Sequence, residues 1–245
     1  STFTQVHSAK CEPVVMDTRF NSSVTDIFRN EYLSPRSPYT TLQIPKQGIG
    51  EWCHPLHTVD INDAGLRSSV QNGILNTELG IPFRTPAEGY NVAFTSLWDN
   101  YPDSLEIPLK GKASRAYLLM AGSTNHMQCH IDNGVIRVYY KDGSCDVMSL
   151  RNPDNWPPIE HIFFEDGLAF NRHTPALYRL RLKTGEISNN FGEELGFPGA
   201  SRELDGGAAV LLEMPLNPDK KLSHLVLETL SNDVVIGLMS ITLQR

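Results

Sequence analysis

Residues 113–150 constrain the fold more than any other stretch, because they read as short strands joined by tight turns. Asn133-Gly134 favours a two-residue hairpin turn, since both residues tolerate positive φ, and Asp142-Gly143 marks a second turn. Strands this close in sequence pair only as an antiparallel meander, because a parallel crossover needs about a dozen residues or more. The stretch therefore predicts antiparallel β architecture, with strands at 116–121, 126–132, 135–140 and 145–150.

The same pattern continues on both sides of this stretch. One short helix is predicted behind Ser22-Ser23, where apolar residues from Val24 to Tyr32 follow helical spacing. Pro108 indicates a sheet edge, since proline lacks the N–H that a ladder uses. Many short strands separated by turns predict an all-β fold, an antiparallel sandwich or jelly roll. The further strand patterns lie at 91–98, 105–109, 176–182, 208–214, 222–230 and 234–243.

Residues 45–90 differ from the rest of the chain because they have no sustained hydrophobic period. Their composition is that of a long structured loop, and such loops often carry function. We therefore expect a loop-rich segment over 1–88 that packs on a β-sandwich domain over 89–245.

The charge pattern excludes some classes of partner. The chain of 245 residues has a formal net charge of −7 and no run of lysine and arginine. This argues against binding to nucleic acid or to anionic membranes. No segment approaches the ~20 apolar residues of a transmembrane helix. A chain that begins at Ser1 is expected to be a mature secreted product or a piece of something longer.

Seven short motifs carry a resemblance to a known family. They are Gly111-Lys112-Ala113, the run 117–125, the turn 140–143, and the stretches 47–53, 63–67, 98–103 and 232–238. The first three look like β-sandwich modules of the galactose-binding-like type. The whole set resembles the C-terminal regions of large secreted glycoside hydrolases from gut Bacteroidetes, and the resemblance covers roughly residues 20–245.

This resemblance implies a β-sandwich portion of a secreted or periplasmic polysaccharide-degrading protein. In such proteins the catalytic domain is usually a separate helical barrel, and nothing in this sequence has that helical content. The implied partners are therefore carbohydrate and a separate catalytic domain of the same protein.

Aromatic residues next to polar ones form the first candidate ligand site. Trp52, Trp98 and Trp156 fall in or beside predicted loops, and Trp98 is followed by Asp99-Asn100-Tyr101. An aromatic ring stacks on the C–H face of a sugar while polar neighbours bind its hydroxyls. The alternative is that these large rings plug the ends of the sandwich.

The most concentrated polar cluster contains Asp60, Asp63 and Arg67, with Glu51 and His54 nearby. Two carboxylates held ~5–10 Å apart would serve as acid and base on a glycosidic bond. The same oxygens would also suit a structural calcium ion, and no other cofactor is predicted. The third reading is an aspartate–arginine network that braces a long loop.

Histidines and cysteines near one another raise the question of zinc. His54 and His57 form an HxxH pair, while His126 lies close to Cys129 and His130. Neither set supplies four ligands at a familiar spacing, so the sequence predicts no metal site and a solvated polar strand face instead. Of the four cysteines, Cys129 and Cys145 lie at alternating apolar positions and are expected to be buried free thiols.

Three hypotheses about function remain open. The first is a non-catalytic accessory sandwich that contacts carbohydrate through Trp52, His54, Arg67 and residues 98–101. The second is a self-contained glycosidase that uses carboxylates from 51–63 and 99–103, with Asp60 and Asp63 as candidates. The third is a structural docking module. An exposed aromatic platform favours binding, a deep cleft with paired acids favours catalysis, and a large exposed apolar face favours docking.

Overall fold

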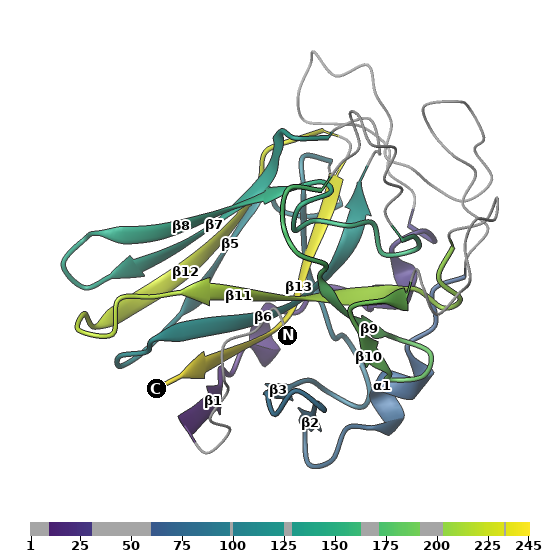
Figure 1. Cartoon of the computed structure of the whole chain (residues 1–245), viewed down its shortest axis with the longest axis horizontal. Helices are drawn as coiled ribbons and strands as arrows, with labels where there is room; N and C mark the ends of the chain where they lie inside the picture. Colours follow the sequence, from purple (N-terminus) through teal and green to yellow (C-terminus); the bar gives the residue numbers. More distant parts are fainter. Residues whose placement is uncertain are drawn as a thin grey trace.

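The computed structural model describes residues 10–30, 60–98, 100–124, 129–162, 172–191, 203–232 and 234–245. Within these residues, two antiparallel sheets pack face to face as a β-sandwich (Figure 1). The predicted all-β class is therefore confirmed. No helix in the described part of the chain is long and apolar enough to cross a membrane.

The larger sheet has seven strands in the order β1-β13-β6-β11-β9-β10, and β4 also pairs with β13. Every one of these pairings is antiparallel. β6 and β13, of 10 and 11 residues, run through its middle. The bounds are β1 Cys11–Pro13, β4 Ala93–Ser96, β6 Arg115–Thr124, β9 Tyr178–Arg181, β10 Ile187–Ser188, β11 Ala208–Pro215 and β13 Val234–Gln244.

The smaller sheet has four strands in the order β5-β12-β7-β8. β5 lies at one edge, so Pro108 stands in an edge strand as predicted. The bounds of the four strands are β5 Ser104–Pro108, β7 Asp132–Tyr140, β8 Cys145–Arg151 and β12 Leu222–Thr229. The remaining elements are α1 Ala64–Ser68, the hairpin of β2 Ile74–Asn76 and β3 Pro82–Arg84, and two 3₁₀ turns, η2 Asp17–Arg19 and η3 Val24–Asp26.

The main core lies between the two sheets. Leu118 and Met120 of β6 point into it from the larger sheet, and Ile136 and Leu225 meet them from the smaller sheet. Each of these side chains is fully buried. Because successive side chains of a strand point to opposite faces, this core takes only every second residue of β6.

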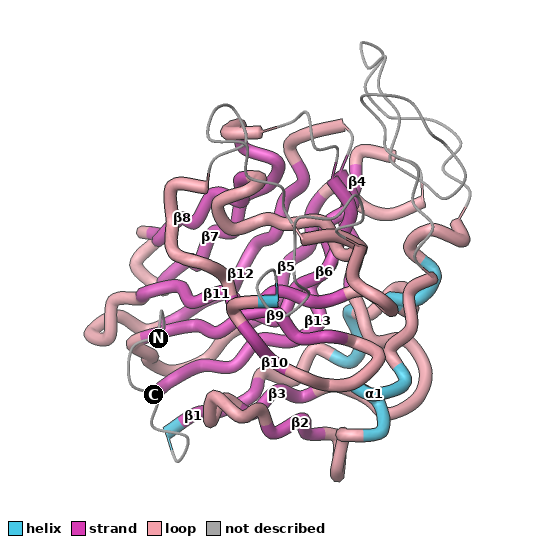
Figure 2. Tube along the Cα trace, turned by 45° about the vertical axis from the view of Figure 1, so that its right-hand side comes forward, coloured by secondary structure: helices cyan, strands magenta, loops and turns pink. Residues whose placement is uncertain are grey.

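The other residues of β6 belong to a second core on the outer face of the larger sheet. Tyr117 and Leu119 pack there against Leu66 of α1 and Phe83 of β3. The elements of the N-terminal part thus cover this face, as Figure 2 shows for α1, β2 and β3. Burial on both faces explains why 116–121 is a continuous apolar run.

The prediction of a hairpin turn at Asn133-Gly134 is wrong, because both residues lie inside β7. β6 and β7 belong to different sheets and therefore do not form a meander. Asn133 is fully buried, and its backbone oxygen accepts hydrogen bonds from the N–H groups of Leu230 and Ser231. At Gly134, an added Cβ would lie 2.3 Å from the side chain of Ile236, so glycine serves close packing here.

The second predicted turn is confirmed. Asp142 and Gly143 connect β7 to β8, which pair as an antiparallel hairpin. Gly143 has a φ of +86°, in the left-handed region that glycine enters without strain.

The helix predicted behind Ser22-Ser23 is a 3₁₀ turn, Val24–Asp26, and Ser23 makes no side-chain capping bond to it. Residues 31–50 lie outside the described part of the chain. The helix that does form, α1, lies where the sequence predicted a loop. Its Gly65 is packed so closely that an added Cβ would be 2.2 Å from the carbonyl oxygen of Lys183. This helix is therefore marked by its packing against residue Lys183, and not by a hydrophobic period in its own sequence.

Substitution of Gly122 tests the close packing of β6. An added Cβ would lie 2.0 Å from the carbonyl oxygen of Val235 and 2.5 Å from the ring of Trp156. Because a backbone atom of the paired strand must move, we expect Gly122→Ala to lower the free energy of unfolding by about 3 kcal/mol. Urea denaturation measures this. Gly143→Ala, with open space around it, is the control and should cost only about 1 kcal/mol.

The turn between β7 and β8 predicts that the stability of the fold depends on pH in the acidic range. Hydrogen bonds from the hydroxyl and the N–H of Ser144, and then from Lys220, lower the pKa of Asp142 from 3.8 to about 2. A lowered folded-state pKa stabilises the fold above the unfolded value, and this stabilisation is lost as the pH falls from 3.8 towards 2. As the pH is lowered over this range, the urea midpoint of Asp142→Asn should therefore fall less steeply than the urea midpoint of the wild-type protein.

Candidate functional site

Trp98 and Tyr101, two of the described aromatic residues of the predicted loop site, are buried. Trp98 is 6% exposed, and its Nε1 donates to the carbonyl oxygen of Asn232 at 2.6 Å. Tyr101 is also buried, and its hydroxyl donates to Ser22 Oγ at 3.2 Å. Burial raises the pKa of Tyr101, partly offset by this hydrogen bond. Neither ring offers a surface on which a sugar can stack.

The other members of this predicted site lie in different environments. Trp156 is fully buried in the main core, and Asn100 is exposed. Trp52, His54 and Asp99 lie outside the described residues. The burial of the described tryptophans fits the alternative in which these rings plug the sandwich.

In the predicted polar cluster, Asp63 and Arg67 are joined in one hydrogen-bonded network, and Asp60 is not part of it. Asp63, which is 6% exposed, accepts hydrogen bonds from Arg67 Nε at 2.9 Å and from Asn91 Nδ2 at 2.8 Å. Arg67 also donates to the carbonyl oxygen of Gly89 at 2.8 Å. Asp60 stands apart at the surface, where it pairs with Arg29 at 3.2 Å. The carboxylate of Asp63 thus ties α1 to the segment that leads into β4.

Replacing Asp63 should lower the stability of the fold much more than replacing Asp60. Asp63→Ala leaves the half-buried Nε of Arg67 and the buried amide of Asn91 without their acceptor, so we expect a loss of about 3 kcal/mol in the free energy of unfolding. Asp60→Ala breaks only a surface ion pair and should cost less than about 1 kcal/mol. Urea denaturation of both variants tests the bracing role. Equal small losses would contradict it.

An aromatic and charged surface lies on the outer face of the smaller sheet, which we call the open face. The antiparallel register places His224 of β12 opposite Tyr139 of β7. Their rings stack with centroids 4.8 Å apart and planes 16° from parallel. Beside them, Arg137 pairs with Glu228 at 2.9 Å, and His224 Nε2 lies 3.6 Å from Glu106.

The open face is accessible to solvent. Val147 of β8 is 56% exposed, and Arg137 and Glu228 are half-buried to exposed. Cys145, opposite Tyr139, is exposed as well, so the prediction of a buried thiol there is wrong. Residues 145–150 do form a strand with alternating faces, as predicted. Met148 and Leu150 face the core, so Cys145, on the opposite face of the strand, faces water.

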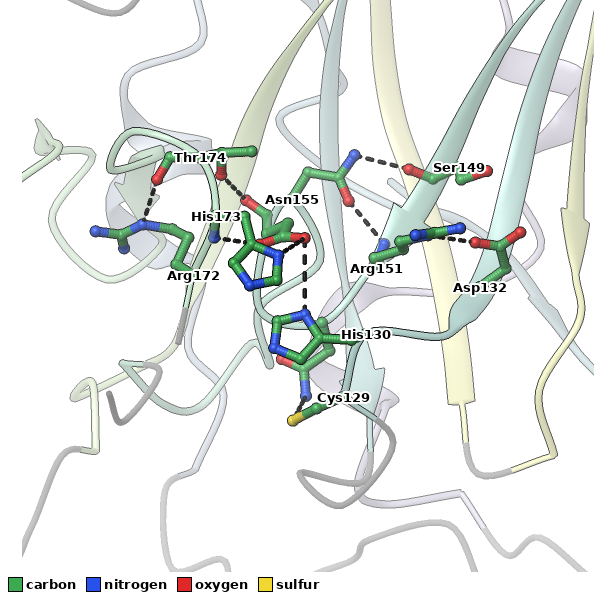
Figure 3. A network of polar contacts seen from close by, with 11 residues as sticks. Cys129, His130, Asp132, Ser149, Arg151, Asn155, Arg172, His173 and Thr174 are labelled. Carbon is green, nitrogen blue, oxygen red and sulfur yellow. Dashed lines mark hydrogen bonds and ion pairs between the residues drawn. The ribbon is translucent and has the colours of Figure 1, made fainter. Parts of the chain in front are cut away.

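A second group of side chains gathers at the loops beside β7 and β8, and Figure 3 shows it from close by. His130 precedes β7, Asp154 follows β8, and His173 lies in the loop before β9. One ligand atom from each residue lies within 4.8 Å of the others. Asp154 Oδ2 is 3.9 Å from His130 Nδ1 and 3.8 Å from His173 Nδ1. The two imidazole rings stack with centroids 4.4 Å apart.

Hydrogen bonds from the backbone hold this group in place. His130 donates its N–H to the carbonyl oxygen of Asn152 at 2.8 Å. The N–H of His173 donates to Asp154 Oδ1 at 2.7 Å, and the Thr174 hydroxyl donates to the carbonyl oxygen of Asp154 at 2.8 Å. The loop that carries His173 is therefore fastened to the loop that carries Asp154.

The sequence considered His130 only with its near neighbours. His126 lies outside the described residues, and the half-buried Cys129 accepts a hydrogen bond from the Asn152 amide at 3.7 Å. Asp154 and His173 were missed because they are separated from His130 by 24 and 43 residues. No local spacing signal joins them, since the strand pairing of β7 with β8 and the 172–177 loop bring them together.

A groove runs beside this group. It has a volume of about 240 Å³ and lies between β8 and β11. Asp154 and Asn155 line one part, and Met148, Tyr178 and Glu213 line others. Most of its polar atoms already have partners within the protein: Glu213, for example, pairs with Arg115 at 2.7 Å. The groove thus offers a largely apolar wall with Asp154 at its edge.

Comparison with known proteins finds no matching family model, no matching curated protein and no matching solved structure. The resemblance to regions of secreted glycoside hydrolases therefore remains a prediction from the sequence.

Proposed function

We propose that this β-sandwich is an accessory, carbohydrate-binding region of a secreted or periplasmic polysaccharide-degrading protein, and that it binds sugar chains without cleaving them. The observation that supports this most directly is the stacked pair of Tyr139 and His224 on the open face. Such a shallow aromatic platform is the feature that separates a binding surface from a catalytic cleft.

The chemistry of the open face suits a carbohydrate. An aromatic ring packs against the C–H face of a sugar, and charged groups beside it form strong hydrogen bonds with hydroxyls. Arg137 lies two residues along β7 from Tyr139 on the same face, and it pairs with Glu228, so both donors and acceptors stand on this face. On the β8 side, Tyr139 lies opposite Cys145, whose side chain is small and exposed. A flat face of this kind fits an extended chain better than a single buried sugar.

The carboxylates argue for binding over hydrolysis. A glycosidase needs one carboxyl group as acid and a second as base or nucleophile, both facing the substrate. Asp63 is buried, and its Oδ2 accepts hydrogen bonds from both Arg67 and Asn91, so this carboxylate is held inside the protein and not presented to a substrate. A separate catalytic domain, as the sequence resemblance implies, would supply the cleaving step.

Polysaccharide retention tests this proposal. The purified chain is run through native gels that contain single plant or host polysaccharides, and new reducing ends are measured in parallel. We expect slower migration with at least one polysaccharide and no new reducing ends. Tyr139→Ala should reduce the apparent affinity by about tenfold or more, because a stacked ring contributes on the order of 1–2 kcal/mol.

The control variant is Tyr90→Ala, which removes a tyrosine that is 58% exposed but lies away from the open face. It should keep wild-type retention, and circular dichroism should show that both variants fold. Release of reducing ends would overturn the accessory function and direct attention to Asp60 and Asp63. If the chain neither binds nor cleaves any of the polysaccharides, the proposal fails and the hypothesis of a structural docking module remains.

A further inference from the structure

We propose that His130, Asp154 and His173 form a binding site for a divalent first-row transition metal ion, with zinc as the best-suited occupant. The three residues are the group of histidine, cysteine and acidic side chains that could hold a metal ion within the described residues. They come from three separate loops that one end of the sandwich brings together. The site is independent of the open face and of its sugar chemistry.

The distances between the ligand atoms support an ion between them. Asp154 Oδ2 lies 3.9 Å from His130 Nδ1 and 3.8 Å from His173 Nδ1, which is too long for a hydrogen bond. Two atoms that each bind zinc at about 2.1 Å with tetrahedral geometry lie roughly 3.4 Å apart. A closure of about half an ångström would bring each nitrogen to this distance from the oxygen, and the two nitrogens, at most 4.8 Å apart, would also have to approach one another.

The hydrogen bonding of the group leaves its ligand atoms available. His130 Nδ1 is buried and has no hydrogen-bond partner among the described residues. Asp154 uses Oδ1 to accept the N–H of His173, so Oδ2 is the oxygen that faces both imidazoles. A buried ring nitrogen without a partner costs free energy, and a metal ion would remove that cost.

The backbone fixes two of the ligands, and the third can adjust. His130 has a φ of +56°, which is uncommon for a residue other than glycine, and its N–H is bonded to Asn152. Asp154 is held by the N–H of His173 and by Thr174. The side chain of His173 is 68% exposed, so its ring can turn away from the stacked position towards the ion without disturbing the core.

The donor set selects the class of metal. Calcium and magnesium prefer oxygen ligands, whereas two imidazoles with one carboxylate suit zinc, iron, nickel or copper. Three protein ligands leave at least one coordination position open. Because His173 is exposed and Asp154 lines the groove between β8 and β11, a water molecule or an oxygen of a bound ligand can take this position.

Calorimetric titration of the tag-free chain tests the site. The protein is first treated with a chelator and dialysed, and then titrated with Zn²⁺. We expect one equivalent to bind and the thermal midpoint to rise, because a ligand that binds only the folded state stabilises it. His130→Ala, Asp154→Asn and His173→Ala should each weaken binding by more than about tenfold, since even residues that only orient a ligand contribute that much.

Two control variants test whether other histidines of the chain contribute to zinc binding. His224→Ala, on the open face, and the double variant His54→Ala/His57→Ala should both keep wild-type zinc affinity. Because His173 is exposed, its alanine variant is expected to fold, which circular dichroism checks. The proposal fails if wild type binds no Zn²⁺, if the His130→Ala/His173→Ala double variant keeps its affinity, or if Ca²⁺ displaces Zn²⁺ at equal concentration.

Discussion

The pairing of β6 with β13 is the interaction on which the rest of the fold depends. The two strands are paired from Thr124 opposite Val234 to Arg115 opposite Gln244, and almost every side chain along them is buried. Gly122 and Gly237 allow close approach near the Thr124 end of the pair, since a Cβ at either position would meet a backbone oxygen at 2.5 Å or less. Among the described residues, the two largest cores lie on opposite faces of this pair.

Because both faces of the larger sheet are covered, the two sheets have different roles. The N-terminal elements occupy the outer face of the larger sheet, so its strands contribute burial and little accessible surface. The smaller sheet has only its inner face in the core, and its outer face carries charged and aromatic side chains. The loops that flank β7 and β8 gather the histidine–aspartate group. The open face therefore belongs to the smaller sheet, whereas the histidine–aspartate group joins its connections to the loop that leads into β9 of the larger sheet.

The sequence located candidate sites in loops, whereas the structure draws attention to strands and to distant loops. Trp98 and Tyr101 have the composition of a sugar site, but their side chains fill space beside Phe94 and hydrogen-bond to neighbours. Tyr139 and His224 are 85 residues apart and become neighbours only through the register of β7 with β12. Composition alone does not distinguish an aromatic residue that packs inside from one that faces solvent.

By itself, the sequence determined the all-β class, the positions of most strands from β4 onward, and the turn at Asp142-Gly143. These features follow from local physics, namely the alternation of side chains and the backbone freedom of glycine. The tertiary structure decided which sheet each strand joins. It placed Asn133-Gly134 inside a strand, because Gly134 packs against Ile236, and it joined His130, Asp154 and His173. Such outcomes depend on contacts between residues far apart in the chain, which no local pattern encodes.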